Sequence, residues 1–396
     1  GDVPERAASA RMPLRHAEFV KEAPAMKAVL DEILADPFNG PVERALERGM
    51  IPVGYTCSMI PEPLLTMGRL FPLRLRAPGV AGTEVADTYL SSVICTYPRS
   101  LLEGAMEGRY DFLGGWVFAA SCDHLRRLFD NLGYLRKPSF MHILDIPHKS
   151  GEGALAWFRE ELEDLLRRLS AHFGFSAADD AVADAVVRHN EFVSLLAEVG
   201  DLRRDEEPLL TGAEFHRIML TVLTVPREEA RELVSSFRDE LSSRPRGIKR
   251  RARLLLAGAE LDDPEYIDAI ESQGALVVAD RFCTGSLPWL EPVTLNGDPL
   301  LSLARHYLNQ NRCSRMMEGH APRRDYIKRL VKEYRADGVV LQSIKFCDTW
   351  GVDLTPLASA LREEGIPVLR LEREYRLSGE GQLRTRVQAF IESMGK

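Results

Sequence analysis

WVFAASCDHLRRLF, residues 116–129, is the stretch that decides how this chain folds. The residues from Trp116 to Ala120 form an apolar run typical of a buried strand, and those from Asp123 onward have the pattern of an amphipathic helix. Cys122 lies between them, where the strand gives way to the helix. A cysteine that served only for packing would fit equally well inside the strand. Its position therefore indicates that a group outside the sheet uses its sulfur.

The same change from strand to helix recurs along most of the chain. Apolar runs of strand length alternate with segments whose apolar residues recur at three- and four-residue steps, and residues 152–240 are almost entirely of the second kind. The predicted strands cover residues 50–56, 70–76, 116–121, 139–147, 251–258, 275–282, 337–346 and 366–374. The other predicted helices cover residues 24–48 (with a break at 37–40), 61–68, 98–108, 123–132, 264–274, 300–310, 323–337, 354–365 and 384–394.

This alternation determines the expected fold class. Strands separated by helices form parallel sheets with helical crossovers. We expect two α/β domains, residues 50–150 and 245–396, joined by a helical segment over 151–244. Residues 1–49 form an N-terminal helical region in this scheme.

Composition excludes some partners. The net charge of −8 provides no basic field to attract phosphates, so we expect no nucleic-acid partner. The basic cluster at 244–251 is interpreted as a solvated linker. No apolar segment approaches the length of a membrane span, and the charged N-terminus does not resemble a signal peptide. We therefore expect a soluble, cytoplasmic protein with no membrane partner.

The chain contains six cysteines, three in each predicted α/β domain and none in the helical segment. Four directly follow predicted strands: Cys57, Cys122, Cys283 and Cys347. Cys95 precedes a helix, and Cys313 follows one. Ligands bind outside the carboxyl ends of parallel strands, so these positions indicate a cofactor site formed by both domains. The alternative is that the cysteines are small buried apolar residues.

The spacing of the cysteines narrows the choice of ligand. A disulfide framework would be unusual in a chain of this length without a secretion signal. There is no CxxC pair, which argues against a zinc ribbon, a ferredoxin-type cluster and a thioredoxin-type redox pair. Soft thiolates from distant strand ends suggest an iron–sulfur cluster held between the domains. His124 is either a further ligand or, as we expect, an exposed or supporting residue in the first helical turn.

Three motifs resemble a known family. ICTYPRSLLEGAMEGRYDFLGGWVFAASCDHLRRL (94–128), DGVVLQSIKFCD (337–348) and GEGQLRTRVQAFIESM (379–394) are similar to sequences of the 2-hydroxyacyl-CoA dehydratase and benzoyl-CoA reductase family. The resemblance extends from about Met50 to Met394. It implies two flavodoxin-like, that is Rossmann-like, α/β domains with helices between them. It also implies that Cys95, Cys122 and Cys347 hold one [4Fe–4S] cubane with an iron site open to substrate or water.

The other three cysteines extend the resemblance. Cys57, Cys283 and Cys313 lie in GYTCSMIPEPLL, RFCTGS and NRCSRMM. The six-cysteine arrangement resembles the double-cubane cluster proteins of this family, in which two cubanes share a bridging sulfide and each takes three thiolates. That resemblance implies an ATP-dependent, low-potential reductase of small unsaturated molecules. Its electrons would come from a separate ATP-hydrolysing iron–sulfur protein, since this sequence has no P-loop.

Two alternatives stay open. One is a subunit of a 2-hydroxyacyl-CoA dehydratase (a lyase) or of a benzoyl-CoA reductase, acting on an acyl-CoA thioester with a single [4Fe–4S] cluster. The other is a non-enzymatic electron carrier. The family also suggests a homodimer, or a heterodimer with a homologous subunit. We further expect Phe282, Phe346 and Trp116 to be apolar neighbours of the cluster that lower its reduction potential.

Overall fold

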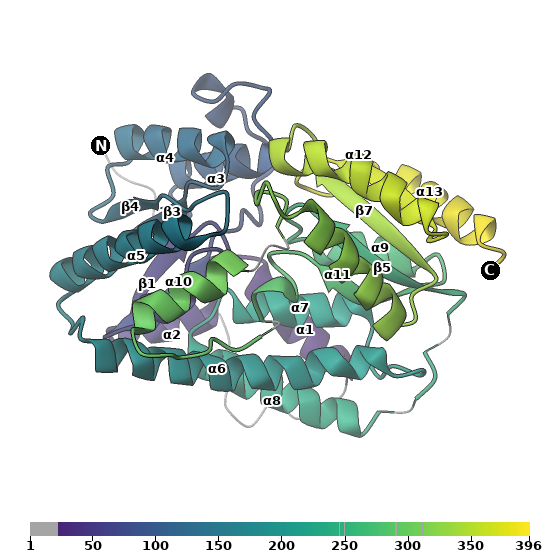
Figure 1. Ribbon diagram of the computed structural model, residues 1–396, viewed down its shortest axis with the longest axis horizontal. Coiled ribbons are helices and arrows are strands. Elements are labelled where there is room, and N and C mark those ends of the chain that lie inside the picture. The colour runs from purple at the N-terminus through teal and green to yellow at the C-terminus, as the bar shows by residue number, and fades with distance from the viewer. Residues whose placement is uncertain (1–22, 245, 249, 290, 310–312) are drawn as a thin grey trace, which may run out of the picture.

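The computed structural model describes residues 23–244, 246–248, 250–289, 291–309 and 313–396. They form two four-stranded sheets, both entirely parallel, surrounded by helices (Figure 1). The predicted fold class, α/β with two flavodoxin-like sheets, is confirmed. No helix of these residues is long and apolar enough to cross a membrane.

The first sheet has the strand order β2-β1-β3-β4. Its central strands are buried on both faces and therefore form continuous apolar runs, as in GWVFA of β3. Pro72 lies in the edge strand β2, where a missing backbone N–H disrupts the ladder least. The elements are α1 (Ala23–Leu34), α2 (Gly40–Glu47), β1 (Ile51–Tyr55), β2 (Leu70–Arg74), α3 (Thr96–Met106), β3 (Gly115–Ala119), α4 (Asp123–Leu135) and β4 (Met141–Leu144).

The second sheet repeats this topology, with the order β6-β5-β7-β8. Gly258 ends β5 with a φ of +146°, and a Cβ there would collide with the carbonyl oxygen of Gln342 on β7. Only glycine allows the two central strands to approach so closely at this edge. The elements are β5 (Ala252–Gly258), α9 (Pro264–Glu271), β6 (Ala275–Arg281), α10 (Pro299–Asn309), α11 (His320–Glu333), β7 (Gly338–Ile344), α12 (Asp348–Glu363), β8 (Val368–Arg373) and α13 (Glu380–Ser393).

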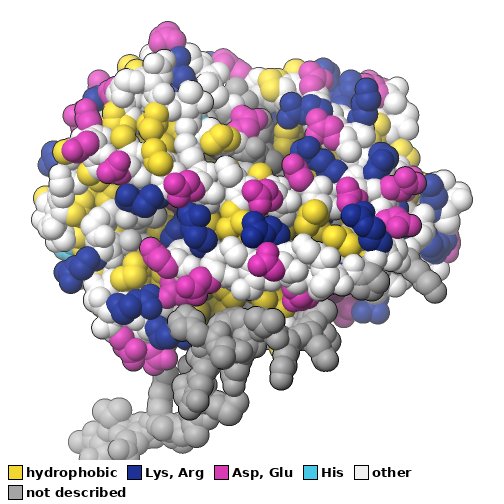
Figure 2. Space-filling view, turned by 90° about the horizontal axis from the view of Figure 1, so that it is seen from below, with side chains coloured by type: hydrophobic (Ala, Val, Ile, Leu, Met, Phe, Trp, Pro, Cys, Tyr) yellow, Lys and Arg dark blue, Asp and Glu magenta, His cyan; other side chains and the backbone are white. Residues whose placement is uncertain are grey.

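Four helices connect the sheets: α5 (Glu152–Phe173), α6 (Asp179–Asp201), α7 (Gly212–Val222) and α8 (Arg227–Ser242). Thr211 and Glu214 form a capping box at the start of α7. Ion pairs join α6 to α8, Arg231 to Glu191 at 3.4 Å and Arg238 to Glu198 at 3.1 Å. Figure 2 shows basic and acidic side chains intermixed over the face seen from below.

One core contains residues of the first sheet, of the connecting helices and of α10, including Val53, Phe158 and Leu303. A helix from the C-terminal half of the sequence thus packs with the first half. Arg315 and Met317, which lie between α10 and α11 in the sequence, also contact the segment after β4, through the carbonyl oxygens of Ile146 and His148. The sheets lie within the predicted α/β ranges, whereas the domain boundaries themselves stay a prediction.

Some predicted elements differ in extent. The helix predicted for 61–68 is a short 3₁₀ turn, Glu62–Thr66, in a segment that contains two prolines. Helix α12 begins at Asp348, immediately after its N-cap residue Cys347 and six residues before the predicted start. The residues in 244–251 that the structure describes join α8 to β5, as the linker interpretation requires, but Arg244 is ion-paired with Glu214 and Glu240 rather than freely solvated.

Candidate functional site

The carboxyl edge of the first sheet carries two cysteines on neighbouring strands. Cys57 follows the end of β1 by two residues, and Cys122 follows the end of β3 by three. The register pairs Tyr55 with both Arg74 of β2 and Val117 of β3. Strands lie about 4.8 Å apart in a sheet, so these residues form one row along the edge. The point between β1 and β3, where the strand order reverses, is where ligands bind in such sheets.

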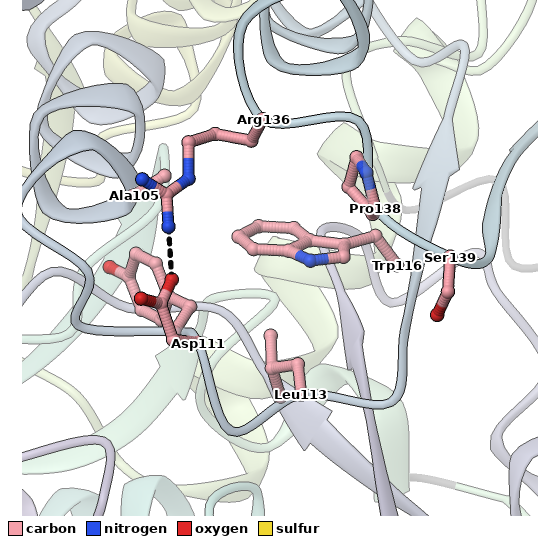
Figure 3. Close-up of a pocket in the computed structure, with 8 residues that line it drawn as sticks. Ala105, Asp111, Leu113, Trp116, Arg136, Pro138 and Ser139 are labelled. Atoms are coloured by element: carbon pink, nitrogen blue, oxygen red, sulfur yellow. Dashed lines mark hydrogen bonds and ion pairs between the residues drawn. The ribbon is translucent and has the colours of Figure 1, made fainter.

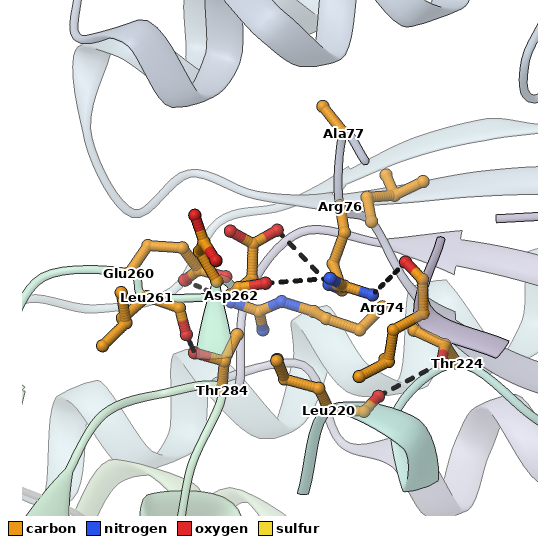
Figure 4. Close-up of polar contacts among 12 residues, drawn as sticks. Arg74, Arg76, Ala77, Leu220, Thr224, Glu260, Leu261, Asp262 and Thr284 are labelled. Atoms are coloured by element: carbon orange, nitrogen blue, oxygen red, sulfur yellow. Dashed lines mark hydrogen bonds and ion pairs between the residues drawn. The ribbon is translucent and has the colours of Figure 1, made fainter. Parts of the chain in front are cut away.

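The second sheet presents a matching row. Cys283 follows β6 by two residues, Glu260 follows β5 by two, and Cys347 follows β7 by three. Contacts across the molecule show that the two rows face each other. Arg76, two residues past β2, lies 3.3 Å from Asp262 past β5 (Figure 4). The N–H of Ala77 donates to the hydroxyl of Tyr375 at 3.0 Å. The cysteines at both edges are therefore directed toward one region.

Three of the cysteines are N-cap residues: Cys95 of α3, Cys122 of α4 and Cys347 of α12. The positive end of a helix dipole favours the anionic form of sulfur. Burial nevertheless raises the pKa of the Cys122 thiol to about 12, and the N–H groups of Leu125 and His124 oppose that rise. Without a bound cation these thiols hold their protons, and a metal cluster would displace them.

All six thiols interact electrostatically within one network, and burial is the largest cause of every resolved shift. Negative charge at Cys347 and then at Cys122 raises the pKa of Cys95. Negative charge at Cys313 raises the pKa of Cys57, and negative charge at Cys57 raises the pKa of Cys283. Two further interactions, Cys57 with Cys122 and Cys313 with Cys347, connect these groups. The structure therefore brings together the six cysteines that the sequence singled out.

Thiolates are the donors that hold iron–sulfur clusters, so the chemistry of these six side chains suits such a cofactor. Among the described residues, no group of three or more His, Cys, Asp or Glu side chains is arranged to hold one metal ion. No disulfide joins the cysteines, all six of which are free.

Two buried arginines that the sequence analysis did not single out lie at the site. Arg74 is 1% exposed, and its Nη2 lies 2.9 Å from Oε2 of Glu260 and 3.5 Å from Sγ of Cys283 (Figure 4). Its Nε and Nη1 have no partner. Arg315 is 2% exposed, and its Nε likewise has no partner. Buried cations with free donors are costly unless anions lie near them, and thiolates are anions.

His124 is buried, so it does not take the first of the two positions expected for it, exposed or supporting. Its Nδ1 accepts a hydrogen bond from the N–H of Cys95 at 3.3 Å, and its Nε2 lies 3.2 Å from Oδ2 of Asp348. One imidazole thus joins the first turns of α3, α4 and α12. It supports the three capping cysteines, which is the second role that the sequence allowed.

A cavity of about 510 Å³ opens beside Cys347. Its lining includes His124, Asp348 and Glu372 as polar groups, with the exposed apolar side chains of Phe346 and Val352 at the surface. Phe346 has a φ of +65°, which is unusual for a bulky residue and common only where a site requires it. The cavity gives molecules in solution a route to the sulfur site.

The prediction that three apolar side chains lie around the cysteines is only partly correct. Phe282 is fully buried beside Cys283, but Phe346 is 46% exposed. The prediction for Trp116 is wrong, because this residue lies at the opposite end of β3 from Cys122. There it lines a smaller cavity of about 200 Å³, near the ion pair between Asp111 and Arg136 (Figure 3). The apolar run alone did not reveal which end of the strand faces the site.

The sequence was compared with known proteins. The model of a family described as 2-hydroxyglutaryl-CoA dehydratase, D-component, matches residues 57–394. The beta subunit of (R)-phenyllactyl-CoA dehydratase from Clostridium sporogenes is 22% identical over 369 residues, covering 92% of this chain and 97% of the relative. A benzoyl-CoA reductase subunit from Thauera aromatica is 22% identical, with 86% and 90% covered. The putative dehydratase subunit YjiM of Escherichia coli K12 is 25% identical, with 88% and 92% covered.

The match to the family covers most of the chain, including all six cysteines and both sheet edges, and it confirms the resemblance predicted from the motifs. The relatives are subunits of dehydratases and of a reductase, which supports an enzymatic role. This chain belongs to the 2-hydroxyglutaryl-CoA dehydratase D-component family.

Proposed function

We propose that this chain is the cluster-bearing component of a low-potential reductase, with two [4Fe–4S] clusters held by its six cysteines. The observation that carries the proposal is the convergence of all six thiols, from both sheet edges, around two buried arginines with unpartnered nitrogens. Iron–sulfur clusters are held by thiolates, and each cluster adds electron-accepting capacity that protein side chains lack.

The interactions among the thiols support a division into two sets. The first set is the one that the resemblance implies holds one cubane: Cys95, Cys122 and Cys347. Negative charge on one of these sulfurs raises the pKa of another. Cys57 interacts with both Cys313 and Cys283, the members of the second set. The contacts between the sets, Cys57 with Cys122 and Cys347 with Cys313, are consistent with two clusters joined by a bridging sulfide.

The cavity beside Cys347 supports the proposed substrate class. Asp348 and Glu372 give its lining a negative character, which opposes the phosphates of coenzyme A. A small neutral unsaturated molecule meets no such repulsion. Electrons would come from a separate ATP-hydrolysing iron–sulfur protein, because the sequence has no P-loop.

A subunit that acts on an acyl-CoA thioester with a single cluster is the second candidate. The activities for which the relatives are named favour it, since their names are those of subunits of (R)-phenyllactyl-CoA dehydratase, lactoyl-CoA dehydratase and benzoyl-CoA reductase. These proteins are named as subunits, so a homodimer or a heterodimer with a homologous chain is also part of the proposal.

Anaerobic preparation and metal analysis test the main proposal. Two cubanes require about eight irons and about eight or nine sulfides per chain, whereas one cubane requires about four irons. Brown protein with the higher content supports the two-cluster assignment. Iron near four, with Cys57, Cys283 and Cys313 all open to alkylation, would move the assignment to the single-cluster subunit. Zinc in place of iron would contradict both.

Assays with the reduced ATP-hydrolysing partner then separate the two reactions. The main proposal predicts ATP-dependent reduction of small unsaturated molecules and slow or absent turnover of CoA thioesters. Dehydration of a 2-hydroxyacyl-CoA at a higher rate would favour the second candidate. Electron transfer without turnover of either substrate class would leave a carrier role.

A further inference from the structure

Arg315 is a buried cation with no carboxylate partner. Its Nη1 donates to the carbonyl oxygen of Pro147 and its Nη2 to that of Ile146, both at 2.8 Å. Its Nε has no partner, and no Asp or Glu of the described residues forms an ion pair with it. Neutral carbonyls offset only part of the free energy that it costs to remove a guanidinium from water. The protein therefore needs negative charge near this side chain.

The backbone shows which groups can supply that charge. The N–H of Ala120 donates to the carbonyl oxygen of Leu144 at 2.9 Å, which aligns the ends of β3 and β4. Cys122 and Ile146 each follow two residues later, so the guanidinium that binds Ile146 lies at the level of Cys122. Arg315 is also two residues from Cys313 along the chain. Burial is the largest influence on the pKa of Arg315 and lowers it, while negative charge at Cys57, Cys313, Cys122 and Asp145 raises it.

The segment that carries Arg315 is fixed against the first half of the molecule. The N–H of Met317 donates to the carbonyl oxygen of His148 at 3.0 Å, and Nδ1 of His148 lies 3.1 Å from the carbonyl oxygen of Arg315. With the two carbonyl contacts of the guanidinium, these bonds hold both the backbone and the side chain. The cation is therefore in place before any electron arrives, which is the condition for electrostatic preorganisation.

The other cations near the thiols are neutralised by carboxylates. Arg74 is paired with Glu260 at 2.9 Å, and Arg99, which lies toward Cys95, is paired with Asp87 at 2.6 Å. Near Cys95 and Cys347 the structure instead places Asp348, whose negative charge raises the pKa of both thiols. Carboxylates thus lie beside both sets of cysteines, because the thiol of Cys283 donates to Oε2 of Glu260 at 2.6 Å, whereas Arg315 has no carboxylate partner among the described residues.

We propose that Arg315 is a fixed countercharge for the clusters that the six cysteines would hold, and that it raises the reduction potential of the site. The inference rests on the proposed function, because it requires clusters on these cysteines. One electron from a low-potential donor adds one negative charge, and no bond forms or breaks. A nearby cation without a carboxylate partner stabilises that charge. Arg315 is accordingly a positioning residue rather than a catalytic one.

The test is a potentiometric titration of the anaerobic holoprotein, followed by electron paramagnetic resonance. Arg315→Gln removes the charge and keeps a hydrogen-bond donor, and Arg315→Lys keeps the charge. We expect Arg315→Gln to lower the equilibrium constant of the first reduction step about tenfold, which corresponds to about 59 mV for one electron. Arg315→Lys should stay near the wild-type potential. Arg217→Gln is the matched control, because Arg217 is equally buried but is paired with Asp31 and Asp268.

The outcomes separate this inference from the proposed function. Wild-type protein without two clusters would contradict the proposed function before any variant is compared. Two clusters with unchanged potentials in Arg315→Gln would overturn the role of Arg315. If Arg315→Gln loses iron from one half while Arg315→Lys retains it, the charge is needed to hold the thiolates, which supports the inference. Loss of iron in both variants would show that the contacts with Ile146 and Pro147 matter rather than the charge, and would overturn it.

Discussion

Arg74 of the first sheet and Glu260 of the second form a buried ion pair, with Nη2 and Oε2 2.9 Å apart (Figure 4). Each residue lies at the carboxyl end of its sheet, Arg74 as the last residue of β2 and Glu260 two residues beyond β5. Cys283 shares the carboxylate, since its thiol donates to Oε2 at 2.6 Å. The pair therefore joins the two halves of the chain at the point where the sulfur site is formed.

Removal of one member of this pair should destabilise the protein strongly. Arg74→Gln leaves Glu260 buried and unpaired, and such changes cost ~3–5 kcal/mol in the free energy of unfolding. Denaturant unfolding monitored by circular dichroism measures the effect. Arg238→Gln is the control, because its partner Glu198 is exposed and surface pairs contribute little. Equal midpoints for the two variants would show that the Arg74–Glu260 pair does not hold the halves together.

Cysteine variants test the division of the thiols into two sets. Cys283→Ser should remove about half of the iron and leave the other cluster visible by electron paramagnetic resonance, since serine is a poor ligand for iron in such clusters. Cys95→Ser should remove the complementary half. The comparison of the two spectra is the measurement. Full iron content and an unaltered spectrum in Cys283→Ser would reject the grouping.

Buried histidines should make the protein sensitive to acid. Burial lowers the pKa of His142 and of His216 to about 4 and lowers that of His189 well below its usual range. Below a pH of about 6.5 the unfolded chain binds protons at these positions while the folded chain does not, so stability falls as pH decreases from about 6.5 to 4. Each histidine contributes a slope of up to about 1.4 kcal/mol per pH unit.

Unfolding measured from pH 8 to 4 checks this expectation. His216→Phe should reduce the slope by about one proton, because it removes a group that the unfolded chain protonates and the folded chain does not. His172 is exposed, and His172→Gln is the control variant. An identical slope in the wild type and His216→Phe would mean that His216 is protonated in the folded state.

The sequence predicted the sheets well because fully buried parallel strands are continuous apolar runs. ALVVADR of β6 and GVVLQSI of β7 were found for that reason. The six cysteines could also be placed, since each lies beside the end of an element. The position of Trp116 was predicted wrongly, because an apolar run identifies a buried strand but not which of its side chains lie near a ligand. His124 has the contacts of a supporting residue, which is one of the two roles expected for it.

Arg74 and Arg315 could not have been assigned to the site from the sequence. Arginine is rarely buried fully, and the burial of these two depends on how the sheets face each other. The one local signal is the apolar surrounding of Arg74 in LFPLRLR, where a charged residue in a buried strand requires a partner. Nothing in that segment identifies the partner as Glu260, which is 186 residues away.

The cavity beside Cys347 can be closed without changing the sulfur site. Gly351 lines it from the first turn of α12, and a Cβ added there meets no atom within 4 Å. Gly351→Leu should therefore fill the space without strain. We expect kcat/KM for the substrate to fall at least about tenfold, since a misplaced reactant loses that much or more. Iron content and the electron paramagnetic resonance spectrum should stay unchanged. Gly381→Leu, also in open space but on α13, is the control. Unchanged turnover by Gly351→Leu would show that substrate reaches the cysteines by another route.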